Sequence, residues 1–345
     1  MPSVPLELAA PVVRPGDQID HYLIDSVAAR SGMASIFRAT DLRGDRPVAI
    51  KVPHPEMEQD STFLARFERE AAIGGDLDHP GVMKVFNEED RSHLYMVMEW
   101  VEGRELRKVI RVNGKLPASR AVKITIGICR ALDYIHSRGV VHRDLKPENI
   151  MVDDEDRTKL IDFGIAGRAG ARQLTFGSLS QIMGTPDYIS PEQVNGKPGD
   201  ARSDVYAVGV MLYEMLTGKT PFRGSNPFAV MNDRLVNNPI PPRELDPEIS
   251  PALQEVIYRA LRRDPAGRYA TAGAFARDLE HPDEIEVADR PELREWDWRK
   301  PPLMKSILSW LGLALIPIMI FALLLQAARV SPAAPSSSTT SLRHR

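Results

Sequence analysis

Residues 140–166, VVHRDLKPENIMVDDEDRTKLIDFGIA, contain the polar pattern that decides the fold of this chain. Asp144, Lys146 and Asn149 lie in the pattern H-R-D-x-K-x-x-N, and Asp162 begins a D-F-G triplet at loop-plus-strand distance downstream. Read one at a time, Asp144 could be a turn residue, Asn149 a helix cap and Asp162 a surface carboxylate. As a set at fixed spacing, they indicate a catalytic site.

With these two motifs, the sequence resembles the eukaryotic-type protein kinase family over about residues 21–280. Within that family it looks most like the membrane-anchored Ser/Thr kinases of bacteria. The resemblance implies an α+β, two-lobed fold, with a small β-rich N-lobe, a larger helical C-lobe, and ATP and Mg²⁺ bound between the lobes.

The local patterns fit this organisation. Short β-branched or alternating runs predict strands at 21–28, 34–41, 46–53, 81–89 and 94–101, and one helical run, 61–77, is inserted among them. After Gly103 the patterns become helical, at 104–112, 118–138, 204–217, 226–236, 251–262 and 270–280. The sequence therefore predicts a small antiparallel sheet that carries one helix and is followed by a helical domain.

By this resemblance, the residues of the catalytic stretch have separate roles in phosphoryl transfer. Asp144 would orient the acceptor hydroxyl and accept its proton, and Lys146 would contact the γ-phosphate. Asn149 and Asp162 would supply the oxygen ligands that Mg²⁺ prefers. Lys146 together with Thr185 of GTPDYISPE is the pattern of Ser/Thr rather than Tyr kinases, so the expected partners are proteins with Ser or Thr acceptors.

Three upstream segments would hold the nucleotide. Lys51 of VAIK matches the lysine that binds the α- and β-phosphates. Glu70 of RFEREAAI is favoured as the partner of that lysine, and Glu68 is the alternative. An error of one residue in this assignment would place the carboxylate on another face of the helix.

The second segment is YMVMEWVEG, which resembles the strand and hinge that receive adenine. Met98 would lie at the back of the pocket, while the Glu99 carbonyl and the Val101 amide would bond to the base. For the side chains, an ordinary core role of Met96 and Met98 is equally compatible.

A third segment, AARSGMASIF at 29–38, occupies the place of the family's phosphate-covering loop, G-x-G-x-x-G-x-V. The loop residues assigned to nucleotide binding are Ala29, Ser31, Gly32, Ala34 and Ile36. Glycine lets the backbone approach phosphates closely and allows positive φ, so small side chains at its positions should weaken the loop only in part. Because the catalytic residues are intact, an active kinase is favoured; the alternative is a pseudokinase or a weakly active ATP-binding signalling scaffold.

Three further residues have structural counterparts in the family. Glu192, in the S-P-E that ends GTPDYISPE, would pair with Arg268 of RDPAGRY in a buried bridge. Asp204 of SDVYAVG would hold the backbone of the catalytic loop. These roles are structural rather than chemical.

Residues 165–183 indicate a switch. This segment contains no acidic residue and offers Thr175, Ser178 and Ser180 as acceptors. In the family, the arginine before the catalytic aspartate, here Arg143, belongs to a basic pocket that a phosphate on this segment neutralises. Self-association in the membrane plane would favour phosphorylation of one copy by another.

The C-terminal part predicts a membrane anchor. Residues 307–328, ILSWLGLALIPIMIFALLLQAA, run 22 residues without a charge, enough to cross a hydrocarbon core of about 30 Å. Basic residues are more frequent before this run than after it, so the kinase domain should be cytoplasmic and the short tail outside the bilayer. The expected segments are a flexible tail 1–20, a kinase domain 21–280, a juxtamembrane linker 281–306, a single-pass span 307–328 and a low-complexity tail 329–345.

Composition adds two constraints. The formal net charge of −3 gives no electrostatic reason to expect nucleic acid as a partner. The single cysteine, Cys129, excludes an intramolecular disulfide and favours a reducing compartment. Because Cys129 lies in an apolar helical pattern, a buried structural thiol is expected.

Overall fold

The computed structural model describes residues 13–87, 91–162 and 186–288 of the chain. The predicted span 307–328, the tail 329–345 and most of the predicted linker 281–306 lie outside these residues. Within the described ranges, no helix combines the length and the apolar character needed to cross a bilayer. The membrane anchor therefore stays a prediction.

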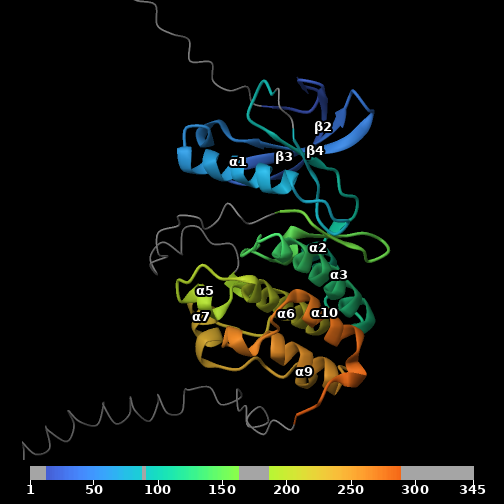
Figure 1. Cartoon of the computed structure of the whole chain (residues 1–345), viewed down its shortest axis with the longest axis vertical. Helices are drawn as coiled ribbons and strands as arrows, with labels where there is room; N and C mark the ends of the chain where they lie inside the picture. The colour runs from blue at the N-terminus through green and yellow to red at the C-terminus, as the bar shows by residue number, and fades with distance from the viewer. Residues whose placement is uncertain (1–12, 88–90, 163–185, 289–345) are drawn as a thin grey trace, which may run out of the picture. The chain divides into compact units, whose positions relative to one another are not determined.

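A six-stranded antiparallel sheet forms the N-lobe (Figure 1). Its order is β1-β2-β3-β4-β6-β5, with β1 at Gln18–Ile19, β2 at Tyr22–Arg30, β3 at Ala34–Asp41, β4 at Arg46–Pro53, β5 at Val85–Phe86 and β6 at Met96–Glu99. Helix α1 (Ser61–Gly75) begins after Asp60, whose carboxylate accepts hydrogen bonds from the backbone N–H groups of the first turn. The predicted sheet with one helix is thus present.

Two details of the N-lobe differ from the predicted ranges. Strand β1 lies inside the range 1–20 predicted as a flexible tail, because a two-residue strand is too short to give an alternating pattern. Strand β5 covers only two residues of the predicted run 81–89, because the backbone of Met83 bonds to another segment of the protein instead.

Strand β4 buries both of its faces, because alternate side chains enter two different cores. Val48 and Ile50 pack in a cluster with Tyr22 and Tyr95 on one side of the sheet. Ala49 points to the opposite side and belongs to the large core that continues into the C-lobe. The apolar run before Lys51 is therefore fixed from both sides, which sets the direction of the lysine side chain.

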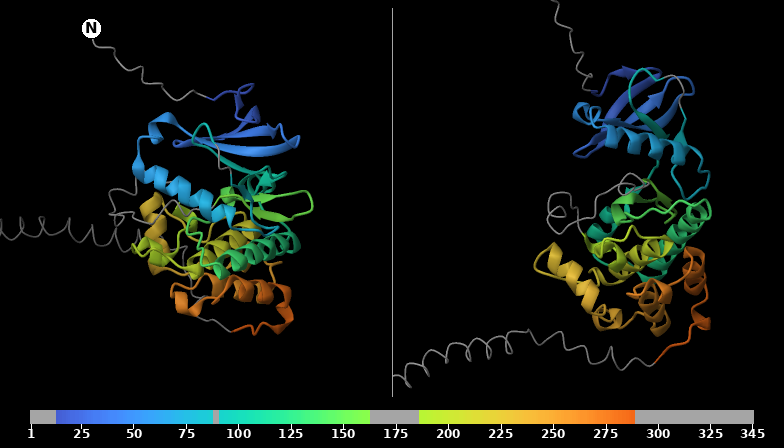
Figure 2. Two further views of the ribbon diagram at one scale, coloured as in Figure 1. Left: turned by 45° about the horizontal axis from the view of Figure 1, so that its top comes forward. Right: turned by 60° about the vertical axis from the view of Figure 1, so that its left-hand side comes forward.

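The C-lobe is built from helices, as Figures 1 and 2 show. They are α2 (Leu106–Asn113), α3 (Ala118–Ser137), α5 (Pro191–Val194), α6 (Ala201–Thr217), α7 (Pro227–Val236), α8 (Pro242–Leu245), α9 (Pro251–Ala260) and α10 (Ala272–Glu280). Short 3₁₀ helices are η1 (Pro55–Met57), η2 (Pro147–Asn149), η4 (Pro186–Tyr188), η5 (Pro265–Gly267) and η6 (Pro282–Glu284). Helices α5 and α8 were not predicted, because four residues cannot show helical periodicity.

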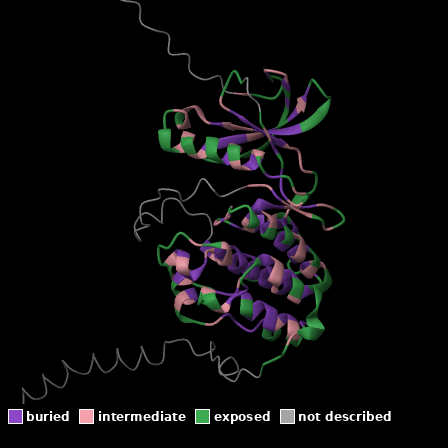
Figure 3. Cartoon of the chain, in the orientation of Figure 1, coloured by how far each residue is buried: buried purple, intermediate pink, exposed green. Residues whose placement is uncertain are grey.

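Helix α6 forms the centre of the C-lobe (Figure 3). Every residue from Ser203 to Leu216 is buried, so the helix packs against neighbours on all sides, including α3 and α9. The thiol of Cys129, on α3, is fully buried in the same core, as expected, and burial raises its pKa.

A second, three-stranded sheet lies between this helical core and the N-lobe. It contains β7 (Arg104–Glu105), β8 (Ile150–Val152) and β9 (Thr158–Leu160) in that order. The backbone N–H of Met83 donates to the Leu160 carbonyl at 2.8 Å, and Leu160 N–H donates to Gly81 at 2.9 Å. The sheet thereby joins the two lobes just before Asp162.

Candidate active site

The catalytic stretch folds into a compact loop between α3 and β8. Lys146 Nζ lies 2.9 Å from Asp144 Oδ2, and both side chains reach solvent. The Asn149 amide nitrogen donates to the Asp144 carbonyl at 2.9 Å. This bond uses the nitrogen of Asn149 and leaves its Oδ1 oxygen, the atom suited to a metal ion, for another partner.

Asp162 follows β9 and is next to this loop. The backbone N–H of Ile161 donates to the Asn149 carbonyl at 3.0 Å, which brings the two predicted metal ligands onto adjacent segments. The described residues contain no group of three or more His, Cys, Asp or Glu side chains arranged for a metal ion. Two protein oxygens fit Mg²⁺, because this ion usually takes one or two protein ligands and completes its shell with phosphates and water.

Lys51 and Glu70 form an ion pair across the N-lobe. Lys51 Nζ lies 2.8 Å from Glu70 Oε1, so the structure pairs the lysine with Glu70 and not with Glu68. Burial alone would lower the pKa of Lys51, but Asp162 and Glu70 attract its proton and the net pKa is raised. Burial, with repulsion from Asp162, raises the pKa of Glu70 to about 7 despite the attraction of Lys51.

The predicted hinge follows strand β6. Met98 is buried opposite Ala49 of β4, and it packs in the large core. Glu99 and Val101 are half-buried. The Glu99 carboxylate is held by Lys159 Nζ, at 2.6 and 2.7 Å from its two oxygens, so the hinge side chain is tied to strand β9 of the second sheet.

The glycine-poor loop is the turn between β2 and β3. Ala29 pairs with Ile36 in the hairpin ladder, and Ser31, Gly32 and Met33 form its exposed tip. Ala34 begins β3 and is buried. The assigned loop residues therefore lie along one hairpin. Its second strand, β3, pairs with β4, which carries Lys51.

Asp204 fixes the backbone of the catalytic loop. Its two carboxylate oxygens accept hydrogen bonds from His142 N–H at 2.9 Å and from Arg143 N–H at 2.8 Å. His136 Nε2 lies 2.8 Å from the same carboxylate. The contact with Asp204 follows the expectation, whereas His136 was missed because a histidine in a helical pattern gives no sign of its partner.

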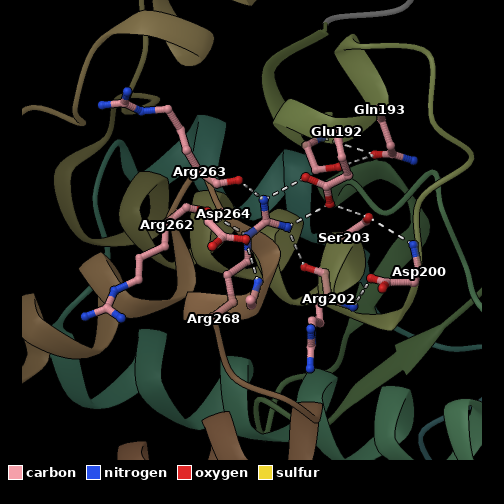
Figure 4. Close-up of polar contacts among 11 residues, drawn as sticks. Glu192, Gln193, Asp200, Arg202, Ser203, Arg262, Arg263, Asp264 and Arg268 are labelled. Carbon is pink, nitrogen blue, oxygen red and sulfur yellow. Dashed lines mark hydrogen bonds and ion pairs between the residues drawn. The ribbon is translucent and has the colours of Figure 1, made fainter.

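Glu192 and Arg268 form a buried, two-bond ion pair (Figure 4). The distances are 2.8 and 2.7 Å, and the Arg268 side chain is 0% exposed. Burial would raise the pKa of Glu192, but hydrogen bonds from Arg268 and Ser203 outweigh it and lower the pKa to about 2. The predicted bridge is therefore present and strongly favours the ionised carboxylate.

Two arginines that sequence reasoning missed hold the 3₁₀ helix η4, Pro186–Tyr188. Arg107 of α2 donates to Glu148 and to Glu214, each at 2.8 Å, and also contacts the Tyr188 hydroxyl. Arg234 of α7 is buried and donates to the carbonyls of Pro186 and Asp187. Both arginines lie in ordinary helical patterns, so only the three-dimensional contacts reveal them.

The predicted switch falls outside the described residues. Thr175, Ser178, Ser180 and Thr185 all belong to the range 163–185. Arg143 is described, and its Nε atom is buried without a hydrogen-bond partner in the part of the chain that the structure describes.

Known proteins are similar to this chain in sequence and in fold. A family model described as protein kinase domain matches residues 30–280. A probable serine/threonine-protein kinase of Corynebacterium efficiens is 42% identical over 270 residues, which cover 76% of this chain and 41% of that protein. The serine/threonine-protein kinase PknB of Mycolicibacterium smegmatis is 37% identical, with 79% of this chain and 45% of that protein covered. This chain thus spans less than half the length of these two relatives.

Among solved structures, the PknI kinase domain of Mycobacterium tuberculosis is similar to 79% of this chain, with 100% of that chain covered, a TM-score of 0.62 and 25% identity. A Rad53 fragment in complex with AMP-PNP is similar over 76% of this chain and 65% of that chain, with a TM-score of 0.60 and 29% identity.

Proposed function

Because this chain belongs to the protein kinase family, we propose that it transfers the γ-phosphate of ATP to Ser or Thr hydroxyls of protein substrates. One observation carries this proposal. The Lys51–Glu70 ion pair, Asp162 and the Asp144–Asn149 loop are all present within one site, with the side-chain types that phosphoryl transfer needs.

Each residue has a role that follows from its surroundings. The exposed Asp144 carboxylate accepts the proton of the incoming hydroxyl, and the adjacent Lys146 ammonium supplies positive charge beside it. Lys51 stays charged because its pKa is raised, and it binds phosphate oxygens. Asn149 Oδ1 and Asp162 would hold Mg²⁺, which when bound neutralises the negative charge of the phosphates.

Replacement of Asp162 tests this assignment. Asp162→Ala should abolish Mg²⁺-dependent ATP turnover and leave the melting temperature near that of the unmodified protein, because the side chain serves the metal rather than the core. Asp154→Ala is the matched control, since Asp154 is 99% exposed. Unchanged turnover in Asp162→Ala would contradict the proposal.

A second candidate function is an ATP-binding scaffold without transfer activity. The replacement of glycine by Ala29, Ser31 and Ala34 favours it over a fully efficient enzyme. The two candidates differ in one measurement: a scaffold binds ATP but does not incorporate phosphate into any protein substrate.

Autophosphorylation of residues 165–183 is part of the proposed regulation. The buried Arg143 Nε, which lacks a partner among described residues, supports it, because a phosphate brings about −1.5 to −2 charges and three strong acceptor oxygens. Self-association in the membrane would supply the second kinase molecule.

Membrane anchoring through residues 307–328 is the last part of the proposal. The uncharged run of 22 residues supports it, with the kinase domain cytoplasmic and the tail outside. Protease added to intact cells should remove only the tail. Degradation of the kinase domain under these conditions would overturn this topology.

A further inference from the structure

A side chain closes the tip of the loop that would cover the phosphates. The Ser31 hydroxyl oxygen accepts hydrogen bonds from the backbone N–H groups of Ala34 at 3.1 Å and Met33 at 3.3 Å. It also donates to the Ala34 carbonyl at 3.0 Å, while Ser31 N–H donates to the same carbonyl at 2.9 Å. This is a hydroxyl-stabilised turn, which glycine at position 31 could not form.

The backbone of this turn does not depend on glycine. None of the residues from Ala29 to Ala34 has a positive φ. A Cβ atom added at Gly32 would meet nothing within 4 Å. The conformation is therefore available to alanine and serine without strain, and the effect of Ser31 must come from its hydroxyl rather than from its backbone.

The Ser31 hydroxyl accepts hydrogen bonds from the backbone N–H groups that would bind a phosphate. Loops of this kind hold phosphate oxygens with backbone N–H groups. The amides of Met33, at the tip, and of Ala34, at the start of β3, already donate to Ser31 Oγ. Met33 is held from its other side as well, because its carbonyl accepts a hydrogen bond from His54 N–H at 2.9 Å. The Met33 and Ala34 N–H groups are thus already hydrogen-bonded within the turn.

We infer that Ser31 is a positioning residue that tunes ATP affinity, an inference that rests on the proposed ATP binding. Its hydroxyl takes the acceptor position of a phosphate oxygen and holds the loop closed. ATP has to displace this hydroxyl from the Met33 and Ala34 amides before those amides can bind phosphate. A neutral hydrogen bond of this kind contributes about 0.5–1.5 kcal/mol net, which corresponds to about a two- to thirteenfold weaker affinity for ATP.

The test compares Ser31→Ala, Ser31→Gly and Ser31→Thr in the full chain. Calorimetric titration with ATP and, separately, with adenosine measures the dissociation constants. Ser31→Ala and Ser31→Gly should both tighten ATP binding about two- to thirteenfold and leave adenosine binding unchanged, because adenosine has no phosphate. Ser31→Thr keeps the hydroxyl and should retain the original ATP affinity.

Amide hydrogen exchange without nucleotide gives a second readout. In Ser31→Ala, the Met33 and Ala34 amides should exchange faster than in the unmodified protein, since they lose their acceptor. Unchanged or weaker ATP binding in Ser31→Ala, or equal tightening of adenosine, would overturn the inference and leave the kinase proposal intact. An unmodified protein that binds adenosine and ATP equally poorly would instead contradict the proposed function, and the exchange rates would still test the Ser31 bonds.

Discussion

Asp204 accepts a hydrogen bond at 2.8 Å from the backbone N–H of Arg143, the residue directly before the predicted base Asp144. Arg143 has a φ of +65°, in the left-handed region that non-glycine residues rarely adopt. Asp204 belongs to α6, the most extensively buried helix of the C-lobe. The buried centre of the domain therefore holds the left-handed backbone that directly precedes Asp144, the predicted base.

Replacement of Asp204 by asparagine should lower kcat about ten- to a hundredfold, because small misplacement of a catalytic group is costly. The reason lies in the donors that the carboxylate satisfies. His142 and Arg143 both donate backbone N–H groups to it, one to each oxygen. An asparagine has one oxygen and would turn its NH₂ group toward one of these donors.

Steady-state kinetics and thermal melting together check this prediction. Asp200→Asn is a matched control, since Asp200 caps the same helix and asparagine is also a good cap. A loss of kcat with a small change in KM for ATP would support the positioning role. An Asp204→Asn protein with unchanged kcat would contradict it.

The pH dependence of ATP use should reflect Glu70. Its pKa is raised from 4.5 to about 7 in the nucleotide-free protein. Below pH 7 the carboxyl group takes up a proton, and the ion pair with Lys51 is lost. The kcat/KM for ATP should therefore fall as the pH decreases from about 8 to 6.

Glu70→Gln tests this assignment, because the amide cannot titrate. Its kcat/KM should be low at every pH and should lack the decline near pH 7. A decline of the same shape in Glu70→Gln would assign the titration to another group.

Acid unfolding should depend on Glu192. Its pKa in the folded protein is about 2, below the ordinary value of 4.5. A lowered pKa stabilises the folded state above the unfolded value, and this contribution is lost as the pH falls from about 4.5 to 2. Glu192→Gln should be less stable at neutral pH and should lose less stability over that pH range.

Urea unfolding at several pH values measures the effect, with Glu248→Gln as a surface control. Breaking a buried pair by removing one partner costs about 3–5 kcal/mol. Equal stability of Glu192→Gln and the unmodified protein at pH 7 would show that the pair with Arg268 contributes nothing net.

Alanine at Thr175, Ser178 and Ser180 together tests the proposed switch. Phosphopeptide mapping after incubation with ATP should locate phosphate on at least one of the three in the unmodified protein, with Ser178 or Ser180 expected before Thr175. The triple variant should phosphorylate an added substrate more slowly, because Arg143 lacks the phosphate that would neutralise it. A triple variant that works at the original rate would rule out the switch.

Much of this site could be predicted from sequence because its motifs are local. The H-R-D-x-K-x-x-N and D-F-G patterns predict Asp144, Asn149 and Asp162 directly, and the VAIK motif, with its distance from the loop that ends at Ala34, predicts Lys51. The Lys51–Glu70 and Glu192–Arg268 contacts were expected from the family resemblance and are both present.

Long-range contacts of residues outside the family motifs could not be predicted in this way. Arg107 and Arg234 are ordinary polar residues within helical patterns, and their partners lie tens of residues away in sequence. Ser31 shows a different limit. From the sequence, Ser31 at a glycine position predicts only a loss of backbone freedom. In the structure, the Ser31 hydroxyl makes three hydrogen bonds within the loop.

Transfer of γ-labelled phosphate to a protein substrate tests the central claim most directly. The full chain, incubated with labelled ATP, Mg²⁺ and a Ser/Thr-rich protein such as casein, should place the label on Ser or Thr of the chain itself or of the substrate. Asp144→Asn should bind ATP as well as the unmodified protein does and should transfer essentially no label, because the amide cannot accept the hydroxyl proton. Equal labelling by Asp144→Asn, or ATP binding without any labelling by the unmodified protein, would contradict the account.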